Sequence, residues 1–122
     1  MKKVTANTAQ KYLEKGLGHY NKGEFNEAVE AYRKAIELRG GNFAKAYFNL
    51  GRALSDLGDL DAAIAAYRTA VEQQSRNPES YYHLGLALAR KGLLNEAISA
   101  YRTAIDQREG VHAWAYHNLG LA

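Results

Sequence analysis

Apolar residues recur along this chain at three- and four-residue spacing. One series consists of Tyr47, Leu50, Leu54 and Leu57. Another consists of Ala63, Ile64, Tyr67, Ala70 and Val71. Such spacing places the apolar side chains of each series on one face of a helix with 3.6 residues per turn. The pattern therefore predicts an all-α chain without β-strands.

The same pattern returns every 34 or 35 residues. Three stretches align in register, and they are GEFNEAVEAYRKAIELR from Gly23, GDLDAAIAAYRTAVEQQ from Gly58 and GLLNEAISAYRTAIDQR from Gly92. A second block precedes each stretch and recurs once more at the end of the chain, with glycines at Gly16, Gly51, Gly85 and Gly120. Each unit is thus predicted to form two helices. Because one unit cannot cover its own apolar face, the units must stack on one another.

Glycine and capping residues mark the predicted helix ends. A glycine stands where the first helix of each unit should end in a left-handed residue, at Gly23, Gly58 and Gly92. The residues three positions later are expected to cap the second helices, and they are Asn26, Asp61 and Asn95. Asn77 and Pro78 predict a helix start near residue 78, since proline suits the first helical position.

Small residues are expected where the two helices of a unit cross. Gly51 on a first helix and Ala63 on a second helix lie near this crossing, where a larger side chain would push the backbones apart. Ala66 lies off the predicted stripe, so it should tolerate a larger side chain. Aromatic bulk at the junction between one unit and the next is assigned to Tyr32, Tyr67 and Tyr101.

The spacing resembles that of the tetratricopeptide repeat family, whose 34-residue unit has small residues at positions 8, 20 and 27. Counted from Ala9, Ala44, Pro78 and Ala113, position 8 is glycine in every unit, and positions 20 and 27 are alanine in the complete ones. The resemblance implies a right-handed superhelical solenoid of antiparallel helix pairs, about seven helices in all. Its boundaries are an N-terminal extension at 1–8 and an array at 9–122, made of repeats 9–43, 44–77 and 78–112 and a partial repeat 113–122.

In this family the first helices line a concave groove that holds a peptide or a partner's helix. The corresponding positions here are mostly apolar and aromatic, and Arg52 and Arg90 add cations suited to a ligand carboxylate, with Ser55 and Asp56 beside them. The resemblance thus implies a protein or peptide ligand with apolar and acidic residues. The candidate ligand-binding residues are Leu13, Leu17, Tyr20, Phe48, Asn49, Arg52, Tyr82, His83, Leu86, Arg90, Trp114, His117 and Leu121.

One subfamily of these domains grips the C-terminal carboxylate of chaperone tails. It uses a Lys, Asn, Asn, Lys, Arg set of side chains, and the matching positions here are Leu13, Leu17, Asn49, Glu79 and His83. Only Asn49 agrees with that set. The sequence therefore disfavours a chaperone tail as the ligand.

The composition and the absence of known catalytic motifs exclude several classes of function. The 122 residues include no cysteine, which excludes disulfides, cysteine-bound zinc and thiol nucleophiles. No motif of a zinc protease, a serine hydrolase or a phosphate-binding loop is present. We therefore expect no enzymatic activity, no catalytic residue, no metal site and no cofactor.

Charge and hydropathy restrict the partners further. The net charge is +3, and residues 1–43 supply all of it, so no long basic stripe exists to hold a nucleic-acid backbone. The longest apolar run, from Ala62 to Tyr67, is far shorter than the ~20 residues of a membrane span, and no signal peptide is visible. We expect a cytoplasmic protein without membrane contact.

Three functions stay open from the sequence. The favoured one is a non-catalytic scaffold for protein–protein interaction. An RNA-binding helical-repeat module is the alternative, because related 35-residue repeats bind single-stranded RNA. The third is self-association into a homo-oligomer through an uncapped C-terminal end, with Trp114, Tyr116 and Leu119 as the contact residues.

Overall fold

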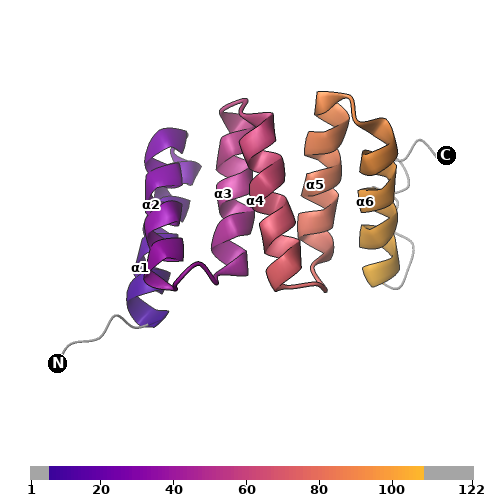
Figure 1. The fold of residues 1–122 in the computed structure, drawn as a ribbon. Helices are drawn as coiled ribbons and strands as arrows, with labels where there is room; N and C mark the ends of the chain where they lie inside the picture. The colour runs from indigo at the N-terminus through magenta and orange to yellow at the C-terminus, as the bar shows by residue number, and fades with distance from the viewer. Residues whose placement is uncertain (1–5, 109–122) are drawn as a thin grey trace.

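The computed structural model describes residues 6–108, and these form six α-helices with no strand among them. In chain order the helices are α1 Ala6–Asn21, α2 Phe25–Leu38, α3 Ala44–Asp56, α4 Leu60–Gln73, α5 Pro78–Lys91 and α6 Leu94–Gln107. Figure 1 shows α3 to α6 following one another in this order, with α1 partly behind α2 at the start of the row. The seventh helix expected at 113–122, and with it Trp114, Tyr116, His117, Leu119 and Leu121, lies outside the described residues.

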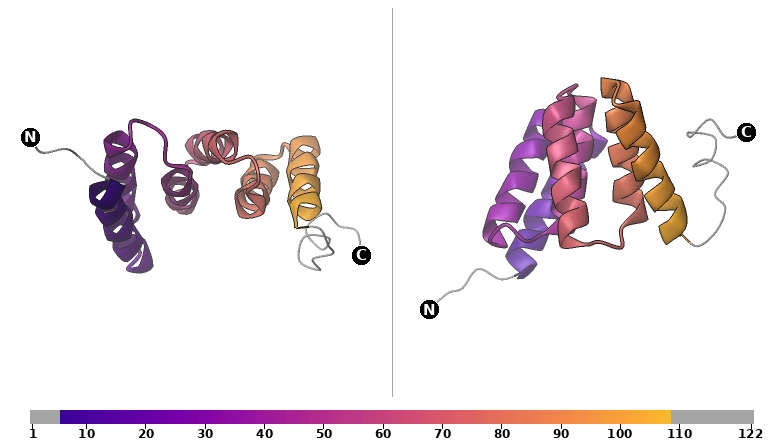
Figure 2. Two further views of the ribbon diagram at one scale, coloured as in Figure 1. Left: turned by 90° about the horizontal axis from the view of Figure 1, so that it is seen from below. Right: turned by 45° about the vertical axis from the view of Figure 1, so that its right-hand side comes forward.

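The helices form three antiparallel pairs, α1 with α2, α3 with α4 and α5 with α6. Each second helix then packs on the first helix of the next pair, which links the pairs into one row (Figures 1 and 2). The first helices also touch one another, α1 with α3 and α3 with α5, whereas no comparable contact joins the second helices in the described chain. The row therefore curves inward on the side of α1, α3 and α5. The predicted all-α solenoid of helix pairs is confirmed.

Left-handed glycines end the first helices as predicted. The φ angles of Gly23, Gly58 and Gly92 are 79°, 86° and 91°. At each of these ends the residue after the glycine donates its N–H to a carbonyl five positions earlier, as from Asp59 to Leu54 at 2.9 Å. This closed turn is the usual glycine-based helix end, and it leaves room for only one residue before the next helix begins.

The predicted N-caps of the second helices are wrong for that reason. The helices begin earlier than expected, so Asn26, Asp61 and Asn95 lie in the first turn of α2, α4 and α6. Asp59 is the cap of α4, and its Oδ1 accepts the N–H of Ala62 at 3.3 Å. The prediction at Asn77 and Pro78 is confirmed, since Asn77 accepts the N–H of Ser80 and Pro78 is the first residue of α5.

A tyrosine fills the space left by a glycine inside each pair. A Cβ placed on Gly51 would lie 2.6 Å from Cε1 of Tyr67, and the same holds for Gly16 with Tyr32 at 2.5 Å and Gly85 with Tyr101 at 2.7 Å. These tyrosines are buried, with Tyr32 fully covered and Tyr67 only 2% exposed. The small residue at the helix crossing is thus confirmed. The tyrosine ring belongs to its own pair as well as to the junction with the next one, which corrects the sequence prediction.

A glutamine at the end of α4 and of α6 holds the start of its own pair. The side chain of Gln73 accepts the N–H of Phe43 at 2.9 Å and donates to the carbonyl of Gly41 at 2.6 Å. Gln107 does the same for the N–H of Asn77 and the carbonyl of Ser75. The first pair has Leu38 at this position and therefore lacks the contact.

Candidate functional site

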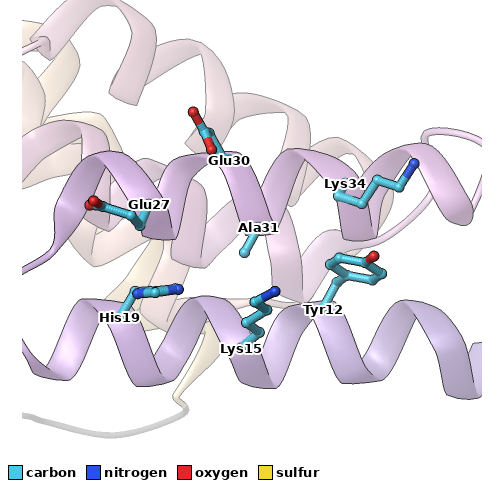
Figure 3. A pocket seen from close by; sticks show the side chains of 7 residues that line it. All are labelled: Tyr12, Lys15, His19, Glu27, Glu30, Ala31 and Lys34. Atoms are coloured by element: carbon cyan, nitrogen blue, oxygen red, sulfur yellow. The ribbon is translucent and has the colours of Figure 1, made fainter.

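Three surface hollows occupy the same place in successive pairs. The first, of about 260 Å³, is shown in Figure 3 and lies between α1 and α2, lined by Tyr12, Lys15, His19, Glu27, Glu30, Ala31 and Lys34. Shifted by one repeat, the same positions line a hollow beside α3 and α4, and shifted by two they line one beside α5 and α6. Because they recur with the repeat, these hollows are a product of stacking and do not single out a ligand site.

The first hollow differs from its equivalents in polarity. Lys15 and His19 stand where the later pairs have Leu50 and Leu54, whose side chains are 3% and 5% exposed. In the later hollows an arginine of the preceding pair forms one wall, and Arg68 there contacts Glu96 at 2.7 Å. No preceding pair covers α1 in the described structure, so its outer face is polar and solvated.

A fourth hollow, of about 280 Å³, lies on the inward-curving face and has no equivalent among these three. We call it the concave hollow, and it is lined by Tyr20, Arg52, Ser55, Asp56, Tyr67, His83, Leu86 and Arg90. These residues come from four helices, α1, α3, α4 and α5. All three pairs therefore contribute to one site.

The side of the concave hollow nearest α1 is fixed by a hydrogen bond between repeats. The Tyr20 hydroxyl donates to Oδ2 of Asp56 at 2.5 Å. Burial raises the pKa of Tyr20, and its bond to the Asp56 carboxylate adds to this. The guanidinium of Arg52 lies 4.8 Å from the ring centre of Tyr20 and 5.9 Å from that of Phe48, so two aromatic rings hold the cation in place.

The opposite side is fixed by Arg90 of α5. Its Nη1 donates to Oγ of Ser55 at 2.9 Å, which joins the second and third pairs. Neither Arg90 nor Arg52 forms an ion pair with a carboxylate within residues 6–108. Two guanidinium groups thus stand in one hollow with Asp56 as the only carboxylate among its lining residues.

The back wall is aromatic and contains a neutral histidine. The His83 ring lies 5.2 Å from Phe48, 6.1 Å from Tyr67 and 5.4 Å from Tyr82, measured between ring centres. Burial, with Arg52 nearby, lowers the pKa of His83 to about 4, so the imidazole is uncharged at neutral pH. Neither its ring nitrogens nor the Tyr67 hydroxyl make a hydrogen bond in the described chain. They remain available to a ligand.

The structure brings half of the described groove candidates into one hollow. Tyr20, Arg52, His83, Leu86 and Arg90 line the concave hollow. The half-buried Leu17, Phe48 and Tyr82 pack at the edge of the core. Tyr67 joins the site from a second helix, and sequence reasoning missed it because the family pattern assigns the groove to first helices only.

Two predicted groove residues are wrong. Leu13 is fully buried in the hydrophobic core, because α1 packs against both α2 and α3 and needs apolar side chains toward each of them. Asn49 is 6% exposed, and its amide donates to the carbonyl of Lys45 one turn earlier at 3.0 Å. Neither side chain reaches a groove ligand. Two of the five positions of the chaperone-tail set are therefore occupied by core residues.

Two further findings concern metals and membranes. Within residues 6–108 no group of three or more His, Asp or Glu side chains is placed to hold a metal ion. None of the described helices has the length and hydropathy needed to cross a membrane.

A family model described as "Tetratricopeptide repeat" matches residues 13–75 and 48–112. No curated protein matches the chain. Among solved structures, the MamA crystal structure is 30% identical, with 94% of this chain and 70% of that one covered and a TM-score of 0.81. The first TPR of Spaghetti (RPAP3) bound to the HSP90 peptide SRMEEVD is 21% identical, with 95% and 90% covered and a TM-score of 0.90. The Arabidopsis OM64 TPR domain is 24% identical, with 93% of each chain covered and a TM-score of 0.87.

Proposed function

The chain belongs to the tetratricopeptide repeat family, and on that premise we propose that it is a non-catalytic scaffold for protein–protein interaction. It binds a peptide or a partner's helix along the face formed by α1, α3 and α5. The observation that carries this proposal is the concave hollow, to which all three helix pairs contribute side chains.

The expected ligand has apolar residues next to an acidic one. Leu17, Phe48, Tyr82 and Leu86 are partly exposed apolar side chains along this face. Arg52 and Arg90 supply positive charge without a carboxylate partner of their own. A similar structure, the first TPR of Spaghetti, is bound to a peptide that ends in acidic residues, which supports a peptide as the ligand class.

Two charge-reversal variants test the proposal, one on the concave face and one on the second helices. The concave variant carries Arg52→Glu and Arg90→Glu, and the control carries Arg33→Glu and Arg102→Glu, which are exposed positions of α2 and α6. Both variants change the net charge by the same amount. A partner captured by the immobilised chain should be lost with the concave variant and retained with the control. Loss with both variants, or retention with both, would contradict binding on the concave face.

A second candidate function is self-association, and one observation favours it. Leu94 and Ile98 of α6 are 62% and 36% exposed, whereas Ile64, the equivalent of Ile98 one repeat earlier, is 6% exposed where α5 packs on α4. The apolar face that α5 covers on α4 is thus partly exposed on α6 within residues 6–108. A second copy is the occupant we propose for this face.

A further inference from the structure

The acidic group that the groove accepts can be specified further. Resting on the proposed function, we infer that the concave hollow is a subsite for one side-chain carboxylate from within the ligand chain, and that it does not bind a chain-terminal carboxylate or a phosphate. The inference rests on three properties of the hollow: its hydrogen-bond donors, its net charge and the apolar surface on both of its flanks.

Four side chains with hydrogen-bond donors line the hollow, and they are Arg52, Tyr67, His83 and Arg90. The guanidinium of Arg52 lies 4.8 Å from the ring centre of Tyr20 and interacts with its hydroxyl, and five N–H donors on the group leave others for a ligand. Arg90 uses Nη1 for Ser55 and keeps its other N–H groups. The neutral imidazole of His83 and the hydroxyl of Tyr67 line the same hollow and have no hydrogen-bond partner in the described chain. Guanidinium groups pair with carboxylates through two parallel hydrogen bonds, so this donor set suits a carboxylate.

The charge of the hollow matches a single negative charge. Arg52 and Arg90 contribute two positive charges and Asp56 one negative charge, while His83 is neutral above about pH 4. One carboxylate brings this sum to zero. A phosphate monoester carries a charge of about −1.5 to −2 at neutral pH, so it would bring an excess of negative charge beside Asp56. Asp56 cannot move away without breaking its bond to Tyr20.

The flanks of the hollow identify the carboxylate as internal to the ligand. Apolar surface lies on the α1 side at Leu17 and on the α5 side at Tyr82 and Leu86. A ligand that covers both flanks continues past the hollow in both directions, so the carboxylate belongs to a side chain in its middle. The positions used for a chain end in the chaperone-tail set offer no alternative. Leu13 and Asn49 are buried, and Glu79 carries a negative charge.

Two peptides of equal charge test the inference. The first is acetyl-Leu-Phe-Glu-Leu-Phe-amide, which has only a side-chain carboxylate. The second is acetyl-Leu-Phe-Gln-Leu-Phe with a free C-terminus, which has only a terminal carboxylate. Binding is followed by NMR chemical-shift changes of the full chain at Arg52, Arg90 and His83. We expect the glutamate peptide to bind more tightly by about tenfold or more, the effect of one charge-assisted hydrogen bond.

Variants test whether the glutamate side chain binds in the concave hollow. Arg52→Gln should reduce the affinity for the glutamate peptide by about ten- to a hundredfold, and Arg33→Gln, an exposed arginine of α2, should leave it unchanged. A third peptide with phosphoserine in place of glutamate should bind more weakly than the glutamate peptide. Equal or tighter binding of the terminal-carboxylate peptide or the phosphopeptide would overturn the inference. So would the absence of shifts at millimolar glutamate peptide, or an affinity that Arg52→Gln leaves intact.

These outcomes are separate from those of the face-reversal experiment. A partner that is lost with the concave charge reversal and retained with the control supports binding on the concave face, whichever peptide binds. The specificity for a side-chain carboxylate can therefore fail while the proposed function stands.

Discussion

Gly51 and Tyr67 fit together so closely that a methyl group cannot be placed between them. A Cβ on Gly51 would lie 2.6 to 2.9 Å from three atoms of the Tyr67 ring, and this ring is 2% exposed. The ring is packed against Phe48 and His83 and has little room to move. The glycine is therefore required by the width of the tyrosine ring.

Replacing Gly51 by alanine should destabilise the chain in spite of the better helix propensity of alanine. Overpacking of a core typically costs about 1 to 3 kcal/mol, and we expect the free energy of unfolding in urea to fall by that amount. Gly18 is the matched control, since it is also in a helix and a Cβ there meets nothing within 4 Å. Gly18→Ala should stabilise by about 0.5 to 1 kcal/mol. Equal shifts for the two variants would contradict the packing described.

Gln73 should contribute to stability through its two contacts with the loop before α3. Gln73→Ala removes the acceptor of the Phe43 N–H and the donor to the Gly41 carbonyl. We expect a loss of about 1 to 2 kcal/mol in the free energy of unfolding, and faster hydrogen exchange at the Phe43 amide. Glu72→Ala is the control, because Glu72 is exposed and makes no polar contact in the described chain. Unchanged exchange at Phe43 in Gln73→Ala would show that the contact is not formed in solution.

The buried His83 should make the chain less stable in mild acid. Its pKa is about 4 in the folded chain against 6.5 for an ordinary histidine. Between these values the unfolded state binds the proton and the folded state does not, so stability falls as the pH drops from 6.5 to 4. The loss attributable to this one group is on the order of 3 kcal/mol.

A variant separates His83 from the carboxylates that also titrate in this range. In His83→Asn the decline in stability between pH 6.5 and 4.5 should be smaller than in the unmodified chain, as measured by urea unfolding at each pH. NMR titration of the imidazole should give a midpoint well below 6. A midpoint near 6.5 would place His83 in water and would remove it from the back wall of the concave hollow.

The exposed apolar face of α6 should drive association of the chain with itself. Ile98→Lys places a charge on the exposed apolar face and should reduce concentration-dependent association in sedimentation experiments. Leu57→Lys is the control, since Leu57 is 41% exposed at the turn between α3 and α4. A chain that stays monomeric at every concentration, or that responds equally to both variants, would exclude this face as the contact.

The periodic features of the fold are those that the sequence could predict. The glycine at the end of each first helix, the small residue at the crossing and the start of α5 at Pro78 each depend on contacts within one repeat. Such contacts can be predicted from one residue type that recurs at the same position of each repeat. The predicted N-caps lie too far along the chain, because the pattern of apolar residues does not show how short the turn after each glycine is.

The candidate site was harder to predict because it depends on contacts between repeats. Whether a first-helix side chain faces the groove or the core is decided by how closely α1, α3 and α5 approach, and this is why Leu13 and Asn49 were misassigned. Ala66 was misjudged for a related reason. It is 6% exposed and lines the hollow under Arg33, so a larger side chain there would meet the preceding pair.

The polar outer face of α1 limits which assemblies can form through the exposed apolar face of α6. A contact that joined the α6 end of one copy to the α1 end of the next would repeat without closing and would produce fibres. Lys15 and His19 disfavour this contact between α6 and α1, because a charged and a polar side chain lie where the later pairs have leucine. A contact between the α6 faces of two copies is instead the same on both chains, so it closes at two copies.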